Sequence, residues 1–104
     1  MAGWKLHEGA EADLLAIFDY SAATWGEARA EAYIESLFSR FERLRMLPFR
    51  DASDVVAGLR STRAGRHVVF WLLERGQPPE IIAVLHERMD LLHHLRHRIG
   101  PTPE

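Results

Sequence analysis

The stretch GLRSTRAGRHVVFWLLERGQPPEIIAVLHERMD, residues 58–90, contains two unbroken apolar runs in a chain of 104 residues. The runs are VVFWLL at 68–73 and IIAVL at 81–85, and Gly76, Pro78 and Pro79 between them are typical of a turn. Each run has the length of a strand and lacks polar alternation, so we expect a hairpin buried on both faces. The chain's own helices can cover one face. So short a chain leaves little protein for the second face, and we expect a partner chain there.

Two amphipathic helices precede this stretch. Apolar residues recur at helical spacing from position 14 to position 25 and again from position 30 to position 44, with Gly26 between the two series and Pro48 after the second. A glycine between two such stripes predicts an antiparallel helical hairpin, and the stripes themselves are typical of core faces. The stripe residues are Leu14, Ile17, Phe18, Ser21 and Trp25 in the first helix, and Ala30, Tyr33, Ile34, Leu37, Phe38, Phe41 and Leu44 in the second.

The remaining segments complete the expected fold. Residues 4–7 alternate apolar and polar side chains as a short strand does, residues 48–57 form a long connection, and residues 89–96 suit a short final helix. We therefore expect one α+β domain over residues 1–104, with a core at 4–95 and a frayed tail at 99–104. A helical hairpin packs on one face of a small antiparallel sheet, in the order β-α-α-β-β-β, with the short helix at the C-terminus.

Composition excludes several classes of protein. The chain has no cysteine, so it has neither a disulfide framework nor a thiolate metal site. Its first residues lack the basic and apolar regions of a signal peptide, and no apolar run approaches the length of a membrane span. We expect a cytoplasmic protein that does not associate with a membrane.

The formal net charge of −2 conceals an uneven distribution. Residues 60–98 hold seven arginines against four acidic residues, whereas residues 1–59 are acidic overall. Arginine suits planar, bidentate or stacked contacts better than lysine does. A mixed solvated surface is the alternative interpretation. On the first interpretation the candidate target-binding residues are Arg60, Arg63, Arg66, His86 and Arg88.

The histidines admit two interpretations. His67 and His86 flank the strands and suit either acid–base chemistry or, more commonly, structural hydrogen bonds. His93, His94 and His97 include pairs at the spacing of zinc ligands, but no cysteine or nearby acid completes a tetrahedral set. We therefore expect no metal and no cofactor.

Five segments occur in an order and spacing that match a known family. They are AEADLLAIFDYSAATWGEARAEAYIESLFSRFERL at 10–44, GLR at 58–60, GRHVVF at 65–70, VLHERMD at 84–90 and HL at 94–95. With these segments the sequence resembles, over residues 4–95, the ParE branch of the RelE/ParE toxins.

The resemblance implies the toxin of a bacterial type II toxin–antitoxin pair, neutralised by a small ParD-like antitoxin. In this family the C-terminal segment of the antitoxin wraps the toxin, while its N-terminal half dimerises and binds operator DNA, so the toxin meets that DNA only through its partner. The ParE branch is associated with poisoning DNA gyrase, whereas the RelE branch cuts messenger RNA in the ribosome. One fold carries both functions, so fold alone does not decide between them.

Residue chemistry favours the non-nucleolytic function. RelE-like ribonucleases use lysines and arginines on the sheet and a C-terminal tyrosine or histidine–tyrosine pair, but here Lys5 is the only lysine and no tyrosine follows Tyr33. We therefore expect an inhibitor that binds gyrase and has no catalytic residues. The alternatives are a ribosome-dependent ribonuclease using Arg60, Arg66, His86 and Arg88, or a degenerate module that binds only the antitoxin.

The surface for the antitoxin is predicted from the apolar pattern. If one face of the sheet lacks cover, the side chains of alternate residues on its central strand contact the antitoxin, together with apolar positions on the hairpin. The candidates are Val69, Trp71 and Leu73 on the strand and Leu15 and Trp25 on the first helix.

Overall fold

The computed structural model describes residues 3–99 and confirms the α+β class and the order of the predicted elements. Of the predicted frayed tail, residues 100–104 lie outside the described part, and Ile99 is the last residue of the final helix. The elements in order are β1 (Lys5–Leu6), α1 (Glu8–Trp25), α2 (Glu27–Glu42), the 3₁₀ turn η1 (Leu44–Met46), β2 (Arg50–Asp51), β3 (Leu59–Ala64), β4 (His67–Leu72), β5 (Glu80–His86) and α3 (Leu91–Ile99).

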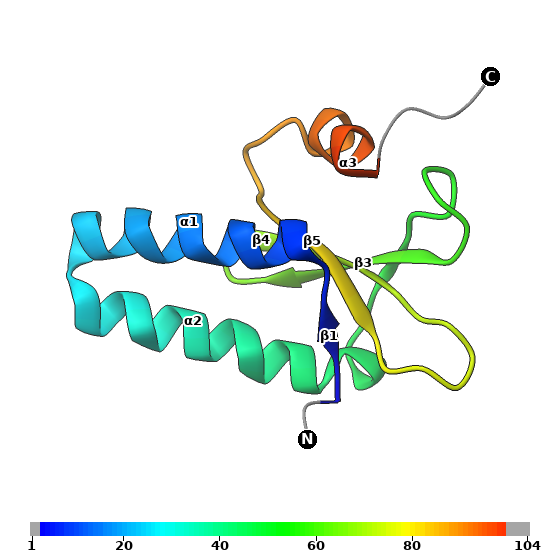
Figure 1. The fold of residues 1–104 in the computed structure, drawn as a ribbon, viewed down its shortest axis with the longest axis horizontal. Helices are drawn as coiled ribbons and strands as arrows, with labels where there is room; N and C mark the ends of the chain where they lie inside the picture. Colours follow the sequence, from blue (N-terminus) through cyan, green and yellow to red (C-terminus); the bar gives the residue numbers. More distant parts are fainter. Residues whose placement is uncertain (1–2, 100–104) are drawn as a thin grey trace.

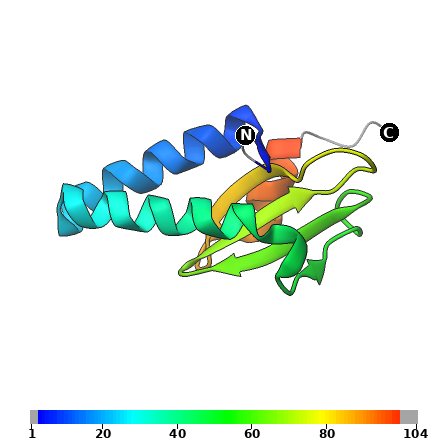
Figure 2. The same ribbon diagram turned by 90° about the horizontal axis from the view of Figure 1, so that it is seen from below.

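Helices α1 and α2 form the predicted antiparallel hairpin. Gly26 connects them with a φ of 96°, a conformation that glycine adopts at little cost, and its N–H donates to the Ala22 carbonyl to close the last turn of α1. The two helices lie side by side, and their connected ends extend beyond the sheet (Figures 1 and 2). Because no strand lies under this tip, Trp25 is exposed although it continues the apolar stripe of α1.

The sheet has five strands in the order β1-β5-β4-β3-β2. Strands β3 to β5 pair antiparallel as expected, and β2, a strand of two residues inside the predicted connection 48–57, pairs antiparallel with β3. By contrast, β1 pairs parallel to β5, with Lys5 opposite Glu80 and Leu6 opposite Ile81. The sheet is therefore mixed, and the prediction of a purely antiparallel sheet is wrong at this edge. A two-residue strand has no side-chain pattern from which the direction of its partner can be inferred.

The two faces of the sheet have separate cores. Residues of β4 alternate between them: Val69 and Trp71 pack beneath α1 and α2 with Leu37 and Phe41, whereas Phe70 packs on the opposite face with Leu95 of α3. Residues 52–56 complete the cover of that second face. The expectation that a partner chain must cover it is wrong, because α3 and the connection between β2 and β3 already do so.

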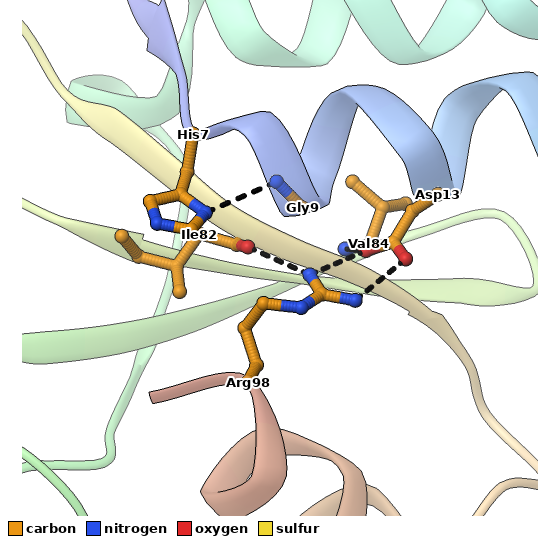
Figure 3. A network of polar contacts seen from close by, with 6 residues as sticks. All are labelled: His7, Gly9, Asp13, Ile82, Val84 and Arg98. Atoms are coloured by element: carbon orange, nitrogen blue, oxygen red, sulfur yellow. Dashed lines mark hydrogen bonds and ion pairs between the residues drawn. The ribbon is translucent and has the colours of Figure 1, made fainter. Parts of the chain in front are cut away.

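A polar network joins α3 to α1 at the edge of β5 (Figure 3). Strand β1 ends at Leu6, so the edge of β5 beyond it needs other partners for its backbone. The Val84 N–H donates to Asp13 at 2.9 Å, and the Ile82 carbonyl accepts from Arg98 at 3.0 Å. Arg98 also donates to both carboxylate oxygens of Asp13, at 2.8 and 3.0 Å. This ion pair satisfies backbone groups that a longer β1 would otherwise bond.

The same network explains the glycine in the first turn of α1. A Cβ at Gly9 would lie 2.5 Å from Cδ and 2.8 Å from Cζ of Arg98, too close for either atom. Gly9 also donates its N–H to Nδ1 of His7, which caps the helix at 3.1 Å. A glycine here therefore lets the guanidinium pass over the start of α1 and reach Asp13.

Candidate functional site

A cleft of about 1040 Å³ lies between the tip of the helical hairpin and the ends of β3, β4 and β5. Its walls are mostly apolar and come from both helices and from the segment after β5. Three arginines also line it: Arg29 from α2, Arg66 from the turn between β3 and β4, and Arg88 after β5. The one acidic lining residue is Asp13, whose carboxylate already pairs with Arg98. The cleft thus combines an apolar wall with uncompensated positive charge.

Tyr33 of α2 lines this cleft and contacts the turn between β3 and β4. Its hydroxyl lies 2.5 Å from Nδ1 of His67 and 3.3 Å from the backbone nitrogen of Arg66. The turn has two residues, Gly65 and Arg66, with glycine at the first position as in a type II′ turn. A Cβ on Gly65 would lie 3.0 Å from the Tyr33 hydroxyl, so the absence of a side chain there allows the close approach.

The segment after β5 is connected to the same turn. The backbone nitrogen of Glu87 donates to the carbonyl of Arg66 at 2.9 Å, and that of Arg88 donates to Nδ1 of His86 at 3.1 Å. The rings of His67 and His86 meet edge to face with centroids 5.3 Å apart. Both histidines thus form hydrogen bonds within the described residues, as the structural interpretation expects, and the acid–base interpretation stays a prediction. Two turns that carry arginines are held together by a small polar cluster.

The protonation states of this cluster follow from burial. Burial, together with the neighbouring His86, lowers the pKa of His67 to about 4, so the ring is neutral at physiological pH. Burial also raises the pKa of Tyr33, opposed by the hydrogen bond from Arg66 and by its charge, so the phenol stays protonated. The contact between Tyr33 and His67 is therefore a hydrogen bond between neutral groups.

The predicted target-binding residues do not form one surface. Arg66, His86 and Arg88 line the cleft, but Arg60 and Arg63 lie elsewhere, on opposite faces of β3. Arg60 stacks with its Cζ 4.1 Å from the centroid of the Phe49 ring, on the face that Trp71 shares. Arg63 forms an ion pair with Glu87 beside a second cleft of about 570 Å³ under α3. The alternation of side chains along a strand separates residues three positions apart.

The predicted antitoxin-binding residues differ in their exposure to solvent. Val69 and Trp71 are both 0% exposed because the helical hairpin covers their face of the sheet, so the expected exposure of these side chains is wrong. Leu73 is half-buried against the same core. By contrast, Leu15 is 63% exposed and Trp25 is 49% exposed, and Trp25 lines the cleft.

Sequence reasoning missed Tyr33, which was assigned to the core stripe of α2. Its ring does pack against the core, but its hydroxyl reaches the cleft. A buried tyrosine hydroxyl needs a hydrogen-bond partner, and this general requirement is the only hint in the sequence of a role beyond the core. The identity of the partner depends on the tertiary contact between α2 and the turn at Gly65.

The histidines of α3 lie on its exposed side, with the ring centroids of His93 and His97 5.5 Å apart. Within residues 3–99 no group of three or more histidine, cysteine or acidic side chains could hold a metal ion. In the same range no helix is both long and apolar enough to span a membrane.

Comparison with known proteins identifies the family. The profile described as the ParE toxin of the type II toxin–antitoxin system parDE matches residues 4–91. Toxin ParE of Escherichia coli is 40% identical over 101 residues, which are 95% of this chain and 98% of that protein. Toxin ParE1 of Caulobacter vibrioides is 36% identical over 97 residues, which are 91% of this chain and 99% of that protein.

A solved structure supports the fold. It is described as the chromosomal ParDE TA system from P. aeruginosa and superposes with a TM-score of 0.68 at 18% identity, covering 83% of this chain and 96% of that one. The similarity in sequence extends over nearly the whole length of two curated toxins, and the family profile spans both the helical hairpin and the sheet. The chain therefore belongs to the ParE toxin family of type II toxin–antitoxin systems.

Proposed function

We propose that this ParE toxin inhibits growth by binding DNA gyrase rather than by catalysing a reaction, and that a ParD-like antitoxin neutralises it. The choice of gyrase rests on the resemblance to the ParE branch. The preference for binding rests on one observation, the neutral Tyr33–His67 pair beside the uncompensated Arg66 and Arg88. Such a toxin acts in the bacterial cytoplasm and meets operator DNA only through its antitoxin.

The polar cluster is poorly suited to cleaving RNA. A general base works best when its pKa lies near the working pH, whereas the pKa of His67 is lowered to about 4 and its Nδ1 is occupied by Tyr33. A general acid needs a group that releases a proton readily, and burial raises the pKa of Tyr33. Arginine does not act as a base in proteins. What the site offers is fixed positive charge, which favours recognition of an acidic surface.

The exposed apolar side chains of α1 support a protein partner. Leu15 in the middle of the helix is exposed, as are Tyr20 and Trp25 towards the tip, whose rings meet edge to face with centroids 6.1 Å apart. Exposed aromatic residues that border a cleft are typical of protein interfaces. We assign this tip to the antitoxin, in keeping with the ParDE description of the structural relative.

A supercoiling assay tests the target. Purified toxin, released from its antitoxin, is added to DNA gyrase and relaxed plasmid, and the products are examined for lost supercoiling and for cleaved DNA held on the enzyme. We expect inhibition that the antitoxin reverses. A Trp25→Ser variant should stay inhibitory but lose affinity for the antitoxin, while an Asp19→Ser variant on the same helix should behave as wild type. No effect on gyrase at any toxin concentration would refute this target.

A ribosome-dependent ribonuclease is the second candidate, because Tyr33, His67, His86 and two arginines meet in one cleft. Translating ribosomes incubated with the toxin would then yield messenger RNA cut at fixed codon positions, with no change in gyrase activity. A chain that affects neither gyrase nor ribosomes yet binds the antitoxin would be a degenerate binding module.

A further inference from the structure

Tyr33 and His67 lie behind the cationic rim of the cleft rather than on it. Arg66 and Arg88 are exposed, whereas the Tyr33 and His67 side chains are half-buried between α2 and the strand ends. Within residues 3–99 neither Arg66 nor Arg88 forms a side-chain hydrogen bond or ion pair. Their backbone nitrogens, by contrast, form hydrogen bonds with the cluster, Arg66 with the Tyr33 hydroxyl and Arg88 with Nδ1 of His86.

The direction of each hydrogen bond can be assigned. The Arg66 N–H donates to the Tyr33 oxygen at 3.3 Å, which leaves the phenolic hydrogen free to donate to Nδ1 of His67 at 2.5 Å. With Nδ1 as the acceptor, the phenolic hydrogen is paired within the described residues, whereas the opposite tautomer would leave it without an acceptor there. We therefore assign Nδ1 of His67 as the acceptor for the hydroxyl that receives Arg66.

The restraint on Arg66 extends to Arg88. The Arg66 carbonyl accepts from the Glu87 nitrogen at 2.9 Å, and His86, which contacts the His67 ring, accepts from the Arg88 nitrogen at 3.1 Å. The two arginine-bearing segments therefore share one set of backbone restraints. A loop fixed before binding does not lose conformational freedom when a partner binds, which increases affinity.

We propose that Tyr33 and His67 are positioning residues, which hold Arg66 and Arg88 at the rim of the cleft in the geometry that the target recognises. This inference rests on the proposed function, since it assumes that the two arginines contact the target. A phenylalanine at position 33 would keep the packing of the ring and the close approach of Gly65. The hydroxyl is thus needed for the position of Arg66 rather than for filling the core.

The experiment compares matched variants of the full chain, produced with the antitoxin and then released. Tyr33→Phe removes the hydroxyl, and Ser39→Ala removes an exposed hydroxyl from the same helix, outside the lining of the cleft, as a control. His67→Leu removes the acceptor, whereas His67→Asn places a side-chain oxygen close to the position of Nδ1. Each variant is measured for growth inhibition on induction, gyrase inhibition, antitoxin affinity and melting temperature.

We expect Tyr33→Phe and His67→Leu to weaken gyrase inhibition about tenfold, which corresponds to about 1.4 kcal/mol, with parallel loss of growth inhibition. Ser39→Ala should match wild type, His67→Asn should recover most of the activity lost in His67→Leu, and antitoxin affinity should stay unchanged in all four. Amide exchange at Arg66 should be faster in Tyr33→Phe than in Ser39→Ala.

Two results would overturn the proposal. One is full toxicity in Tyr33→Phe. The other is equal activity of His67→Asn and His67→Leu, a comparison that holds even if Tyr33→Phe does not fold. Failure of the proposed function looks different, because wild type would then be toxic without inhibiting gyrase. Growth inhibition by the same variants would still test the positioning role for whatever target is present.

Discussion

The two faces of the sheet are both apolar, but different kinds of structure cover them. On the face beneath α1 and α2, which we call the hairpin face, the two long helices bury Trp71, whose indole N–H donates to Thr62 at 3.0 Å. On the other face the nine-residue helix α3 buries Leu95 and leaves Leu92 45% exposed. The first face thus has a continuous core. The second depends on the short helix α3, whose C-terminal turn is joined to α1 by the Asp13–Arg98 ion pair.

This difference indicates how stability and function are divided. A nine-residue helix is too short to be stable on its own, so α3 depends on Leu95 and on Arg98 for its position. The hairpin face fixes the fold, and the cationic turns extend from its edge. Perturbing the two faces separately should therefore have unequal effects on the free energy of unfolding.

The largest effect is expected at the centre of the hairpin face. Trp71→Ala removes a large, fully buried side chain and leaves the Thr62 hydroxyl without its donor, so we expect a loss of about 3–5 kcal/mol in the free energy of unfolding. Denaturant unfolding measures this loss, with the exposed Leu92→Ala as a control expected to change it by less than about 1 kcal/mol. Similar losses in both variants would show that the two faces do not differ as proposed.

The next effect is expected where α3 meets α1. Asp13→Asn keeps the shape of the side chain but leaves Arg98, whose side chain is 22% exposed, without a counter-charge, so we expect a loss of about 1.5–3 kcal/mol in the free energy of unfolding. Arg63→Ala, which breaks an exposed ion pair with Glu87, should cost about 0–1 kcal/mol. Amide exchange should accelerate in α3 and stay unchanged in α2. Acceleration in both helices would mean that α3 is not a separate cover.

The sequence predicted most of the fold because the relevant signals are local. The stripes of α1 and α2, the break at Gly26 and the strand-length runs all depend on neighbouring residues. The parallel pairing of β1 and the cover supplied by α3 depend on contacts distant in sequence, as the pair of Asp13 with Arg98 illustrates. The cover of Val69 and Trp71 by the chain's own helices, in place of a partner chain, was missed for a related reason. An unbroken apolar run shows that both faces are covered, but not by which segment.

The candidate site was predicted only in part. Arg66, His86 and Arg88 were recognised by residue type and do lie together, because the turn at Gly65 leads directly into β4 and the antiparallel pairing of β4 with β5 puts His86 opposite His67. Arg60 and Arg63 were grouped with them by charge alone, which ignores the alternation of faces along β3. Within one helix, Tyr33 looks like any other apolar stripe residue.

The third prediction concerns how stability depends on pH through His67, at the start of β4. The pKa of His67 is about 4 in the folded chain and near 6.5 when unfolded, so the unfolded state binds more protons between these values. The contribution of His67 to the free energy of unfolding is therefore fully present above pH 6.5 and is lost as the pH drops towards 4. We expect this residue to account for about 1–2 kcal/mol, a value reduced for the solvent that screens a half-exposed ring.

Unfolding free energies of wild type and His67→Asn, measured from pH 7.5 to pH 4, check this expectation. The wild-type curve should lose more stability than the variant over the acidic part of the range. Parallel curves would indicate that His67 keeps an ordinary pKa and that the Tyr33 hydroxyl does not require a neutral ring.

The smallest effect on stability is expected at the cationic rim, where the effect on function should be large. Arg66 and Arg88 are exposed and without side-chain partners in residues 3–99, so Arg66→Ala/Arg88→Ala should change the free energy of unfolding by less than about 1 kcal/mol. Gyrase inhibition and toxicity should nevertheless be lost, because these side chains supply the charge that the target recognises. Arg96→Ala/Arg75→Ala, which removes two exposed arginines away from the cleft, is the matched control and should remain toxic. Thermal melting measured beside toxicity separates the possible roles: a stable, fully toxic double variant would remove the rim from the functional site. A stable but inactive double variant would place the function at the cationic rim, beside the hairpin face that contributes most to the free energy of folding.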